Sequence, residues 1–255
     1  MANVAAIVLH YRMPELTRRV VEDIMKQGCV PDVYVVDNGS PESLVSDDSR
    51  VTVMRSETNL FFSGGFNWGV ERVLQRHAYD YLWLVTQDVR LPEMCLERLL
   101  YNIKEFQPCA IVSACVSVDT DGNIPQMLPR RVASVRPVRW LEWIAPLVPV
   151  LAWREVGPLD ERMHFGGMDA DWCYRAVQSG YDCLVDYSVM MRHRHLTVFR
   201  SFKEEDARNP VLQRQIADEA VLREKWGINW YEKLCPEVGA WWYNWQRMRG
   251  IRRTR

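Results

Sequence analysis

The sequence lacks paired cysteines. Its 255 residues contain no CxxC pair, which argues against a zinc ribbon, and its cysteines are odd in number. Scattered cysteines without a secretory signal are typical of reduced thiols in a cytoplasmic protein. The seven positions are Cys29, Cys95, Cys109, Cys115, Cys173, Cys183 and Cys235.

Long apolar runs and an excess of charge of one sign are missing too. The most apolar late stretch, Trp140–Trp153, contains Glu142 and two prolines and is shorter than the roughly 20 residues that span a bilayer. Met1–Leu9 is apolar but short and has no basic lead, so it predicts a strand and not a signal peptide. The net charge of −1 gives the chain as a whole no reason to bind nucleic acid. We expect a cytoplasmic protein without a transmembrane segment.

What the chain does contain is an alternation of strands and helices. Repeated β-α-β units imply right-handed crossovers and a mostly parallel sheet, and 255 residues can form one large α/β domain. The expected strands are Val4–Leu9, Val33–Val36, Val51–Met54, Tyr81–Val85, Ala110–Val118, Leu147–Trp153 and Asp182–Asp186. The expected helices are one from Pro14 to just before Gly28, and Phe66–Arg76, Pro92–Phe106, Asp169–Ser179 and Val211–Trp226, with a long loop over Asn123–Arg139.

The expected central strand ends in Thr86–Gln87–Asp88. In an open α/β sheet, ligands bind outside the carboxyl ends of the strands. Asp88 is therefore placed to face a ligand, and our hypothesis is that it anchors a divalent metal, Mn²⁺ or Mg²⁺, which holds a nucleotide-sugar diphosphate. The alternative is that Asp88 caps the helix that begins near Pro92.

Two other strand-end or loop motifs have both a functional and a structural interpretation. Asp37–Asn38–Gly39–Ser40 is most simply a turn, but Asp37 could also accept a hydrogen bond from a nucleobase imide. Gly64–Gly65, expected just before a helix, would let backbone N–H groups approach a phosphate, or would only mark a bend.

Acidic and histidine pairs follow in the second half of the chain. Asp169 and Asp171, two residues apart, cannot share a helix face, so one could point into a cleft while the other caps the helix. Mutual repulsion and partial burial would raise a pKa, which suits a general base. His193 and His195 share a face if their segment is extended. Imidazole is a suitable ligand for manganese-like ions, although a histidine pair is more often structural.

Taken in order, the motifs of the chain are Asp37–Ser40, Asn59–Gly69, Thr86–Asp88, Gly157–Glu161, Phe165–Arg175, Gly180 and His193. This order resembles glycosyltransferase family 2, most closely its rhamnosyltransferase-like branch, over roughly residues 3–200. The resemblance implies a GT-A (Rossmann-like) α/β fold, with a mostly parallel central sheet flanked by helices, over residues 1–200. A helical C-terminal extension over residues 201–255 would follow.

The resemblance also implies a role for individual residues. Asp169 would be the catalytic base, Asp160 and Asp171 would lie on the acceptor side, and Asp88 with His193 or His195 would bind the metal. Donor-binding roles fall on His10, Tyr11, Asp37, Asn38, Asn59, Gly64, Gly65, Asn67, Gln87 and Asp88. The chain departs from the family pattern twice, with Thr86 at the first carboxylate of the DxD-type motif and Met168 at the Glu before the base.

The function predicted in this way is an inverting, metal-dependent transfer of a hexosyl or deoxyhexosyl group in polysaccharide biosynthesis. The donor would be a UDP- or dTDP-sugar, and the acceptor a hydroxyl group of a glycan or lipid-linked glycan. One alternative is a catalytically inactive sugar-nucleotide-binding scaffold, suggested by Thr86 and Met168. The other is a nucleotidyltransferase, which would carry a Gly-rich, Lys-containing phosphate loop that Leu9–Arg12 does not provide.

The C-terminal stretch Trp241–Arg255 clusters Trp and Arg. This composition fits peripheral contact with an anionic membrane and a lipid-linked acceptor. It equally fits stacking on bases and phosphate contacts, hence a nucleic-acid acceptor. The third interpretation is a helix that packs on its own domain.

Overall fold

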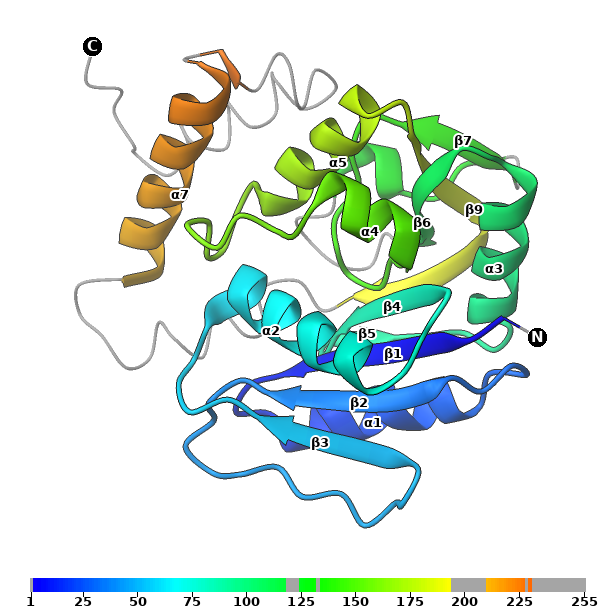
Figure 1. Ribbon diagram of the computed structural model, residues 1–255. Helices are drawn as coiled ribbons and strands as arrows, with labels where there is room; N and C mark the ends of the chain where they lie inside the picture. Colours follow the sequence, from blue (N-terminus) through cyan, green and yellow to red (C-terminus); the bar gives the residue numbers. More distant parts are fainter. Residues whose placement is uncertain (1, 118–123, 132–133, 194–209, 228, 231–255) are drawn as a thin grey trace.

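The computed structural model describes residues 2–117, 124–131, 134–193, 210–227 and 229–230, with helices packed around a central sheet (Figure 1). The strands are β1 (Val4–His10), β2 (Asp32–Asp37), β3 (Val51–Arg55), β4 (Tyr81–Thr86), β5 (Val89–Arg90), β6 (Cys109–Val116), β7 (Val135–Val138), β8 (Leu147–Pro149) and β9 (Asp182–His193). The helices are α1 (Pro14–Met25), α2 (Phe61–Arg76), α3 (Cys95–Glu105), the 3-10 helix η1 (Pro125–Met127), α4 (Val150–Val156), α5 (Met168–Gln178) and α7 (Pro210–Trp226). Within these ranges no helix is long and apolar enough to cross a membrane.

The sheet is mostly parallel, as the sequence predicts. Its strand order is β3-β2-β1-β4-β8-β6-β9-β5, and β7 pairs with β9 from the side. The first four strands of that order are mutually parallel, and β6 is parallel to β9. Three short strands, β5, β7 and β8, are antiparallel to their neighbours. These three were not predicted to be antiparallel.

The strand order changes direction at β1 and β4, which are hydrogen-bonded neighbours in the sheet. The chain passes from β1 through α1 to β2 on one side, and from β3 through α2 to β4 on the other side of β1. Right-handed crossovers in opposite directions place α1 and α2 on opposite faces of the sheet, as Figure 1 shows. Ligands of open α/β sheets bind at such a switch point, outside the carboxyl ends of the strands.

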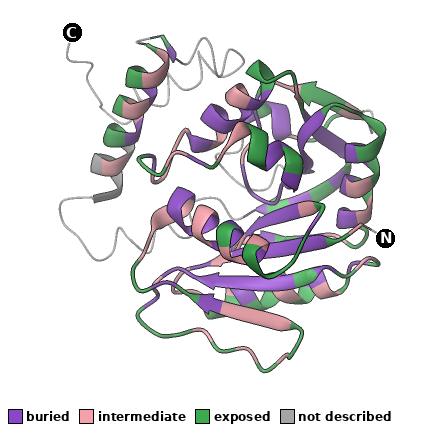
Figure 2. Ribbon diagram, viewed as in Figure 1, coloured by how far each residue is buried: buried purple, intermediate pink, exposed green. Residues whose placement is uncertain are grey.

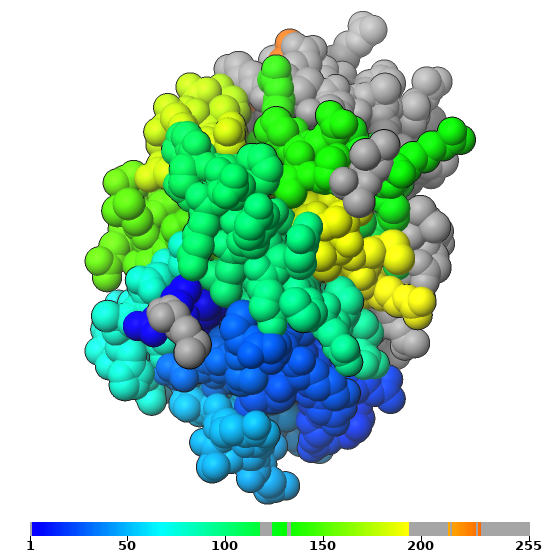
Figure 3. Space-filling view, turned by 90° about the vertical axis from the view of Figure 1, so that its right-hand side faces the viewer, coloured from blue at the N-terminus to red at the C-terminus, as the bar shows by residue number. Residues whose placement is uncertain are grey.

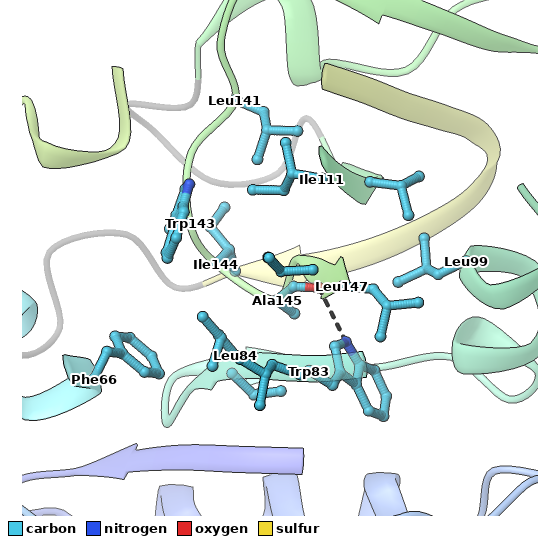
Figure 4. Close-up of a cluster of buried hydrophobic side chains, with 14 of the residues drawn as sticks. Phe66, Trp83, Leu84, Leu99, Ile111, Leu141, Trp143, Ile144, Ala145 and Leu147 are labelled. Carbon is cyan, nitrogen blue, oxygen red and sulfur yellow. Dashed lines mark hydrogen bonds between the residues drawn. The ribbon is translucent and has the colours of Figure 1, made fainter. Parts of the chain in front are cut away.

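The core lies around β4 and β6, where burial is nearly continuous (Figure 2). Strands covered on both faces carry apolar runs and not an alternation. Figure 4 shows Trp83 of β4 in an apolar cluster that also contains Leu99 of α3, Ile111 of β6 and Leu147 of β8. The indole Nε1–H of Trp83 donates to the carbonyl of Ala145 at 3.0 Å, so the polar atom of this buried ring has a partner.

Helix α2 begins at Phe61 and not at Phe66, so the prediction of a glycine loop before the helix is wrong. Gly64 and Gly65 lie inside the first two turns and are buried. A Cβ at Gly65 would stand 2.6 Å from Cδ1 of Leu9 and 3.0 Å from the side-chain nitrogen of Asn38. Glycine therefore serves close packing of the helix on the sheet, which overrides its low helix propensity.

The helix predicted to start at Pro92 begins later, at Cys95, because the preceding segment is bound to α1. Asp23 of α1 accepts hydrogen bonds from the Arg90 side chain and the Leu91 N–H, and Gln27 donates to the Pro92 carbonyl at 3.0 Å. In the space-filling view, the region around α3 lies directly against the α1 region (Figure 3). These contacts hold residues 90–92 in an extended path that a helix could not follow.

Three other predicted boundaries were wrong. The strand expected over Leu147–Trp153 ends at Pro149, which pairs with Tyr81, the first residue of β4, so no partner remains for a longer strand and α4 follows. The long loop Asn123–Arg139 contains η1 and β7. Strand β9 continues well past the predicted end at Asp186, through an irregularity in its register with β6.

Replacing Gly69 with Ala should lower the free energy of unfolding. A Cβ there would stand 2.6 Å from Cγ2 of Val36 and 3.3 Å from Cγ2 of Ile7, both fully buried in the sheet. Overpacking costs about 1–3 kcal/mol, which exceeds the roughly 1 kcal/mol gained in helix propensity. Urea unfolding measures the difference, with Gln75→Ala on the exposed face of the same helix as control. A Gly69→Ala variant as stable as wild type would contradict the close approach.

Candidate active site

Gln87 joins the carboxyl ends of β1 and β4, the two strands at this switch point. The backbone N–H of Tyr11, just after β1, donates to Oε1 of Gln87 at 2.9 Å, and Nε2 of Gln87 donates to the carbonyl of Tyr11 at 2.9 Å. This pair of bonds fixes which end of the amide is the acceptor. Gln87 is buried, and its hydrogen bonds hold the loop after β1 in place. Its predicted contact with the donor stays a prediction.

His10 is buried beside this amide. Its Nδ1 lies 2.7 Å from the hydroxyl of Thr17 and 3.1 Å from Oε1 of Gln87. Because Oε1 can only accept, the Nδ1 of His10 carries the proton in this contact. Burial lowers the pKa of the imidazole, although Asp37 and Gln87 oppose that effect. His10 is therefore neutral at pH 7 and supports the loop behind Tyr11.

Asp37, at the end of β2, is fully buried. Its oxygens accept from the N–H groups of Ser40 and Leu44, both at 3.1 Å, and from the guanidinium of Arg55. Burial raises the pKa of the carboxyl, but the hydrogen bonds outweigh burial and hold that pKa below its ordinary value. Asp37 thus organises the loop after β2 as an anion, and its predicted contact with a nucleobase stays a prediction.

Asn38 and Asn59 fix the start of α2. The Asn38 side chain donates to the Phe61 carbonyl at 2.9 Å and to Oδ1 of Asn59 at 3.1 Å, and it accepts from the Leu60 N–H at 2.9 Å. Oδ1 of Asn59 also accepts from the Phe61 N–H at 2.8 Å. The loop expected to bind the donor is therefore held from within by two side-chain amides.

Asn67, within α2, binds the loop over residues 157–161. Its side chain accepts from the Leu159 N–H at 3.0 Å, and donates to the Leu159 carbonyl and to Glu161, both at 2.9 Å. The predicted donor loop and the predicted acceptor turn are thereby joined through one amide.

Asp88 and His193, the two predicted metal ligands, lie in contact, and their role stays a prediction. Val89 pairs with His193 in the β5–β9 ladder, which brings Nε2 of His193 to 3.4 Å from Oδ1 of Asp88. Burial lowers the pKa of the imidazole, but Asp88 and, to a lesser degree, Glu142 raise it above its ordinary value. His195, the alternative partner, lies outside the described residues.

A carboxylate and an imidazole nitrogen are ligand types that suit Mn²⁺. No group of three such ligands gathers within the described ranges. Asp88 and His193 could supply two protein ligands to a metal. The chemistry of these two residues fits a metal bound together with its nucleotide.

Asp169 and Glu142 complete the acidic part of the site. Asp169 is half-buried in the first turn of α5, where burial raises the pKa of its carboxyl to about 6 against hydrogen bonds from backbone N–H groups. Burial, together with the charge of Asp169, also raises the pKa of Glu142 to about 8, against the opposing effect of His193. The charges of Asp169 and His193 thus both act on the Glu142 carboxyl.

Asp160 and Asp171, expected on the acceptor side, are engaged with α7. Lys225 contacts both carboxylates, at 3.1 Å and 2.7 Å, and Asp171 also accepts from Nε of Arg175 at 3.0 Å. The hydrogen bonds of Arg162 and Lys225 hold the pKa of Asp160 well below its usual range. Both residues act in the structure as anchors for the C-terminal helix.

Three residues of this region were not found from the sequence. Arg55 stands opposite Asp37 in the pairing of β2 with β3. A basic residue at the end of a predicted strand was a signal by which it could have been found. Glu142 was read only as an interruption of an apolar stretch. Its place at the site depends on the contact of the Ile144 carbonyl with the Thr86 N–H at 2.8 Å. Lys225 lies on a helix whose packing no local pattern indicates. The tail Trp241–Arg255 falls outside the described residues.

The sheet order, with its site at the carboxyl ends of β1, β2 and β4, is that of a GT-A glycosyltransferase. The sequence model of the family described as glycosyl transferase family 2 matches residues 5–161, more than half of the chain. The chain belongs to this family. The predicted family and fold are thus confirmed.

Two solved structures illustrate the likeness in fold. The crystal structure of GalNAc-T7 with UDP, GalNAc and Mn²⁺ has a TM-score of 0.64 at 11% identity. The match covers 76% of this chain and 44% of the GalNAc-T7 chain. The crystal structure of S. aureus TarS has a TM-score of 0.56 at 16% identity. That match covers 75% of this chain and 36% of the TarS chain. The chain thus spans less than half the length of either. No curated protein matches in sequence.

Replacing Glu142 with Gln should remove one source of pH dependence in stability. The folded state retains the Glu142 proton up to about pH 8, whereas the ordinary pKa of this group is 4.5. The unfolding free energy of wild type should therefore fall, relative to Glu142→Gln, as pH rises from 4.5 to 8. Urea unfolding in EDTA across this range measures the difference. Parallel curves would contradict the burial of Glu142, and the exposed Glu71→Gln is the control.

Proposed function

We propose that this protein is an inverting, metal-dependent glycosyltransferase that moves a hexosyl or deoxyhexosyl group from a nucleotide-diphosphate sugar to an acceptor hydroxyl. The observation that carries the proposal is the contact of His193 with the Asp88 carboxylate at 3.4 Å. The half-buried carboxyl of Asp169, whose pKa burial raises to about 6, supports it. A base on one side and an acid–imidazole pair on the other are the two functions that a single displacement needs.

Asp169 is the proposed base. Its carboxylate takes the proton of the acceptor hydroxyl as that oxygen forms a bond to the anomeric carbon. The bond from that carbon to the diphosphate oxygen breaks on the opposite face, and the nucleoside diphosphate leaves with the electron pair. A pKa of about 6 keeps Asp169 ionised at pH 7 yet more basic than an ordinary Asp.

Asp88 and His193 are the proposed protein ligands of Mn²⁺ or Mg²⁺, which when bound supplies positive charge to the diphosphate of the donor. The donor proposed is a UDP- or dTDP-sugar. The presence of UDP and Mn²⁺ in the GalNAc-T7 crystal structure supports a nucleotide and metal of this kind, although that protein shares only 11% identity with this chain. A glycan or lipid-linked acceptor and membership of the rhamnosyltransferase-like branch are part of the same proposal.

Nucleotide binding by calorimetry tests the donor site. UDP, GDP and dTDP, with CMP as control, are titrated with and without Mn²⁺. One diphosphate should bind in a metal-dependent way, and Asp88→Ala should weaken that binding by at least about tenfold, or roughly 1.4 kcal/mol. Asp48→Ala, which removes an exposed carboxylate, is the matched control. Failure of every diphosphate to bind at saturating metal would contradict the donor site.

Transfer by Asp169→Asn tests the base. The variant should retain nucleotide affinity and lose about 10²–10⁴-fold in kcat. Because the base must be deprotonated, wild-type kcat/KM should rise with pH and level off above about 6. Asp182→Asn, a partly exposed carboxylate at the far end of β9, is the control. Unchanged turnover in Asp169→Asn would overturn the assignment, whereas nucleotide binding without turnover by wild type favours the inactive scaffold.

A further inference from the structure

Helix α7 binds the loop that leads to Asp169. Asp218 of α7 is almost fully buried, and its carboxylate accepts from three successive backbone N–H groups. These are His164 and Phe165, both at 2.8 Å, and Gly166 at 3.1 Å. Three donors on one carboxylate define the path of the loop just before Gly167, the residue that precedes α5.

Apolar packing brings α7 close to the same loop. A Cβ at Gly167 would lie 2.4 Å from Cδ1 of Leu222, so the backbone at this point touches α7 directly. Gly167 has a φ of +85°, which glycine adopts without strain. The turn into α5 therefore depends on the position of α7 as well as on its own sequence.

Ionic contacts fix the other end of the helix. Lys225 lies between Asp160 and Asp171, and the indole N–H of Trp226 donates to Asp171 at 2.8 Å. The Arg214 guanidinium stands 4.0 Å from the centre of the Phe61 ring, at the start of α2. Helix α7 thus bridges the start of α2, the loop over residues 160–167 and α5, and Figure 1 shows it alongside these elements.

We propose that Asp218 is a positioning residue for transfer: by collecting the N–H groups of residues 164–166, it sets the first turn of α5 and with it the carboxylate of Asp169. This inference rests on the proposed function, in which Asp169 is the base. It makes α7 a working part of the catalytic domain and not a separate extension.

A displacement of a reacting group by about 1 Å can cost 10²-fold in rate. The N–H groups of an irregular loop have no helix or sheet partner, so loss of the carboxylate leaves three donors to water and frees the loop. The Asp88–His193 pair and the Gln87–Tyr11 contact do not involve α7. Donor binding should therefore survive while transfer is lost.

The test compares full-length wild type, Asp218→Asn and Glu219→Gln. Asparagine keeps the shape of the side chain but replaces one acceptor with a donor. Glu219→Gln removes the neighbouring carboxylate, which pairs with Arg223 on the same helix. Three quantities are measured: nucleotide affinity, transfer kcat, and amide hydrogen exchange of the peptide over residues 162–167.

Asp218→Asn should lower kcat by about 10–100-fold, leave nucleotide affinity within about twofold, and speed exchange in the loop, while Glu219→Gln matches wild type. Unchanged exchange or unchanged kcat overturns the proposal. So does an equal fall in nucleotide binding and kcat, which is what a merely structural role would give.

If Asp218→Asn fails to fold, Asp218→Ser, whose hydroxyl brings no second amide donor, decides by the same three measurements. A wild-type chain that binds no nucleotide diphosphate would contradict the proposed function instead. Amide exchange does not depend on a donor, so it separates the two failures.

Discussion

The site depends on one pair of hydrogen bonds, between the Gln87 side chain and the backbone of Tyr11. Strands β1 and β4 are neighbours, but their ladder ends where Leu9 pairs with Thr86. Beyond that point the N–H and C=O groups of the two strand ends need other partners. A buried amide supplies one donor and one acceptor at the required spacing. The two strand ends are thereby held together past the end of their ladder.

The same device recurs at the other loops of the site. Asn38 binds the start of α2, Asn67 binds the backbone at Leu159, and Asp218 binds residues 164–166. Each of these side chains lies on a helix or at the end of a strand. Each binds backbone groups of a segment that makes no sheet hydrogen bonds. Asn38 and Asn67, to which the family resemblance assigns donor contacts, therefore also stabilise the loops of the site. Their replacement would disturb loop geometry before it removed any ligand contact.

The strand ends that carry Asp37 and Asp88 could be located in the sequence because apolar runs and their polar ends are local signals, and the roles of these acids stay predictions. Either His193 or His195 was a possible partner of Asp88. The family resemblance favoured His193, which the β5–β9 ladder brings to Asp88. The features that the sequence did not predict depend on packing between distant segments. The start of α2 at Phe61 depends on how closely glycines let the helix approach β1. The contacts of Asp218 join residues more than 50 positions apart, and no local pattern carries that information.

The two departures from the family pattern take on a physical meaning in this setting. Met168, in place of a Glu, is buried in the core and adds no charge beside Asp169. The carboxyl that does neighbour Asp169 is that of Glu142, and its pKa of about 8 keeps it neutral at pH 7. Thr86 is uncharged as well, so neither departure adds a negative charge beside Asp88 or Asp169. In the proposed site, fewer like charges would repel a diphosphate less, and a metal would depend more on the diphosphate for its ligands.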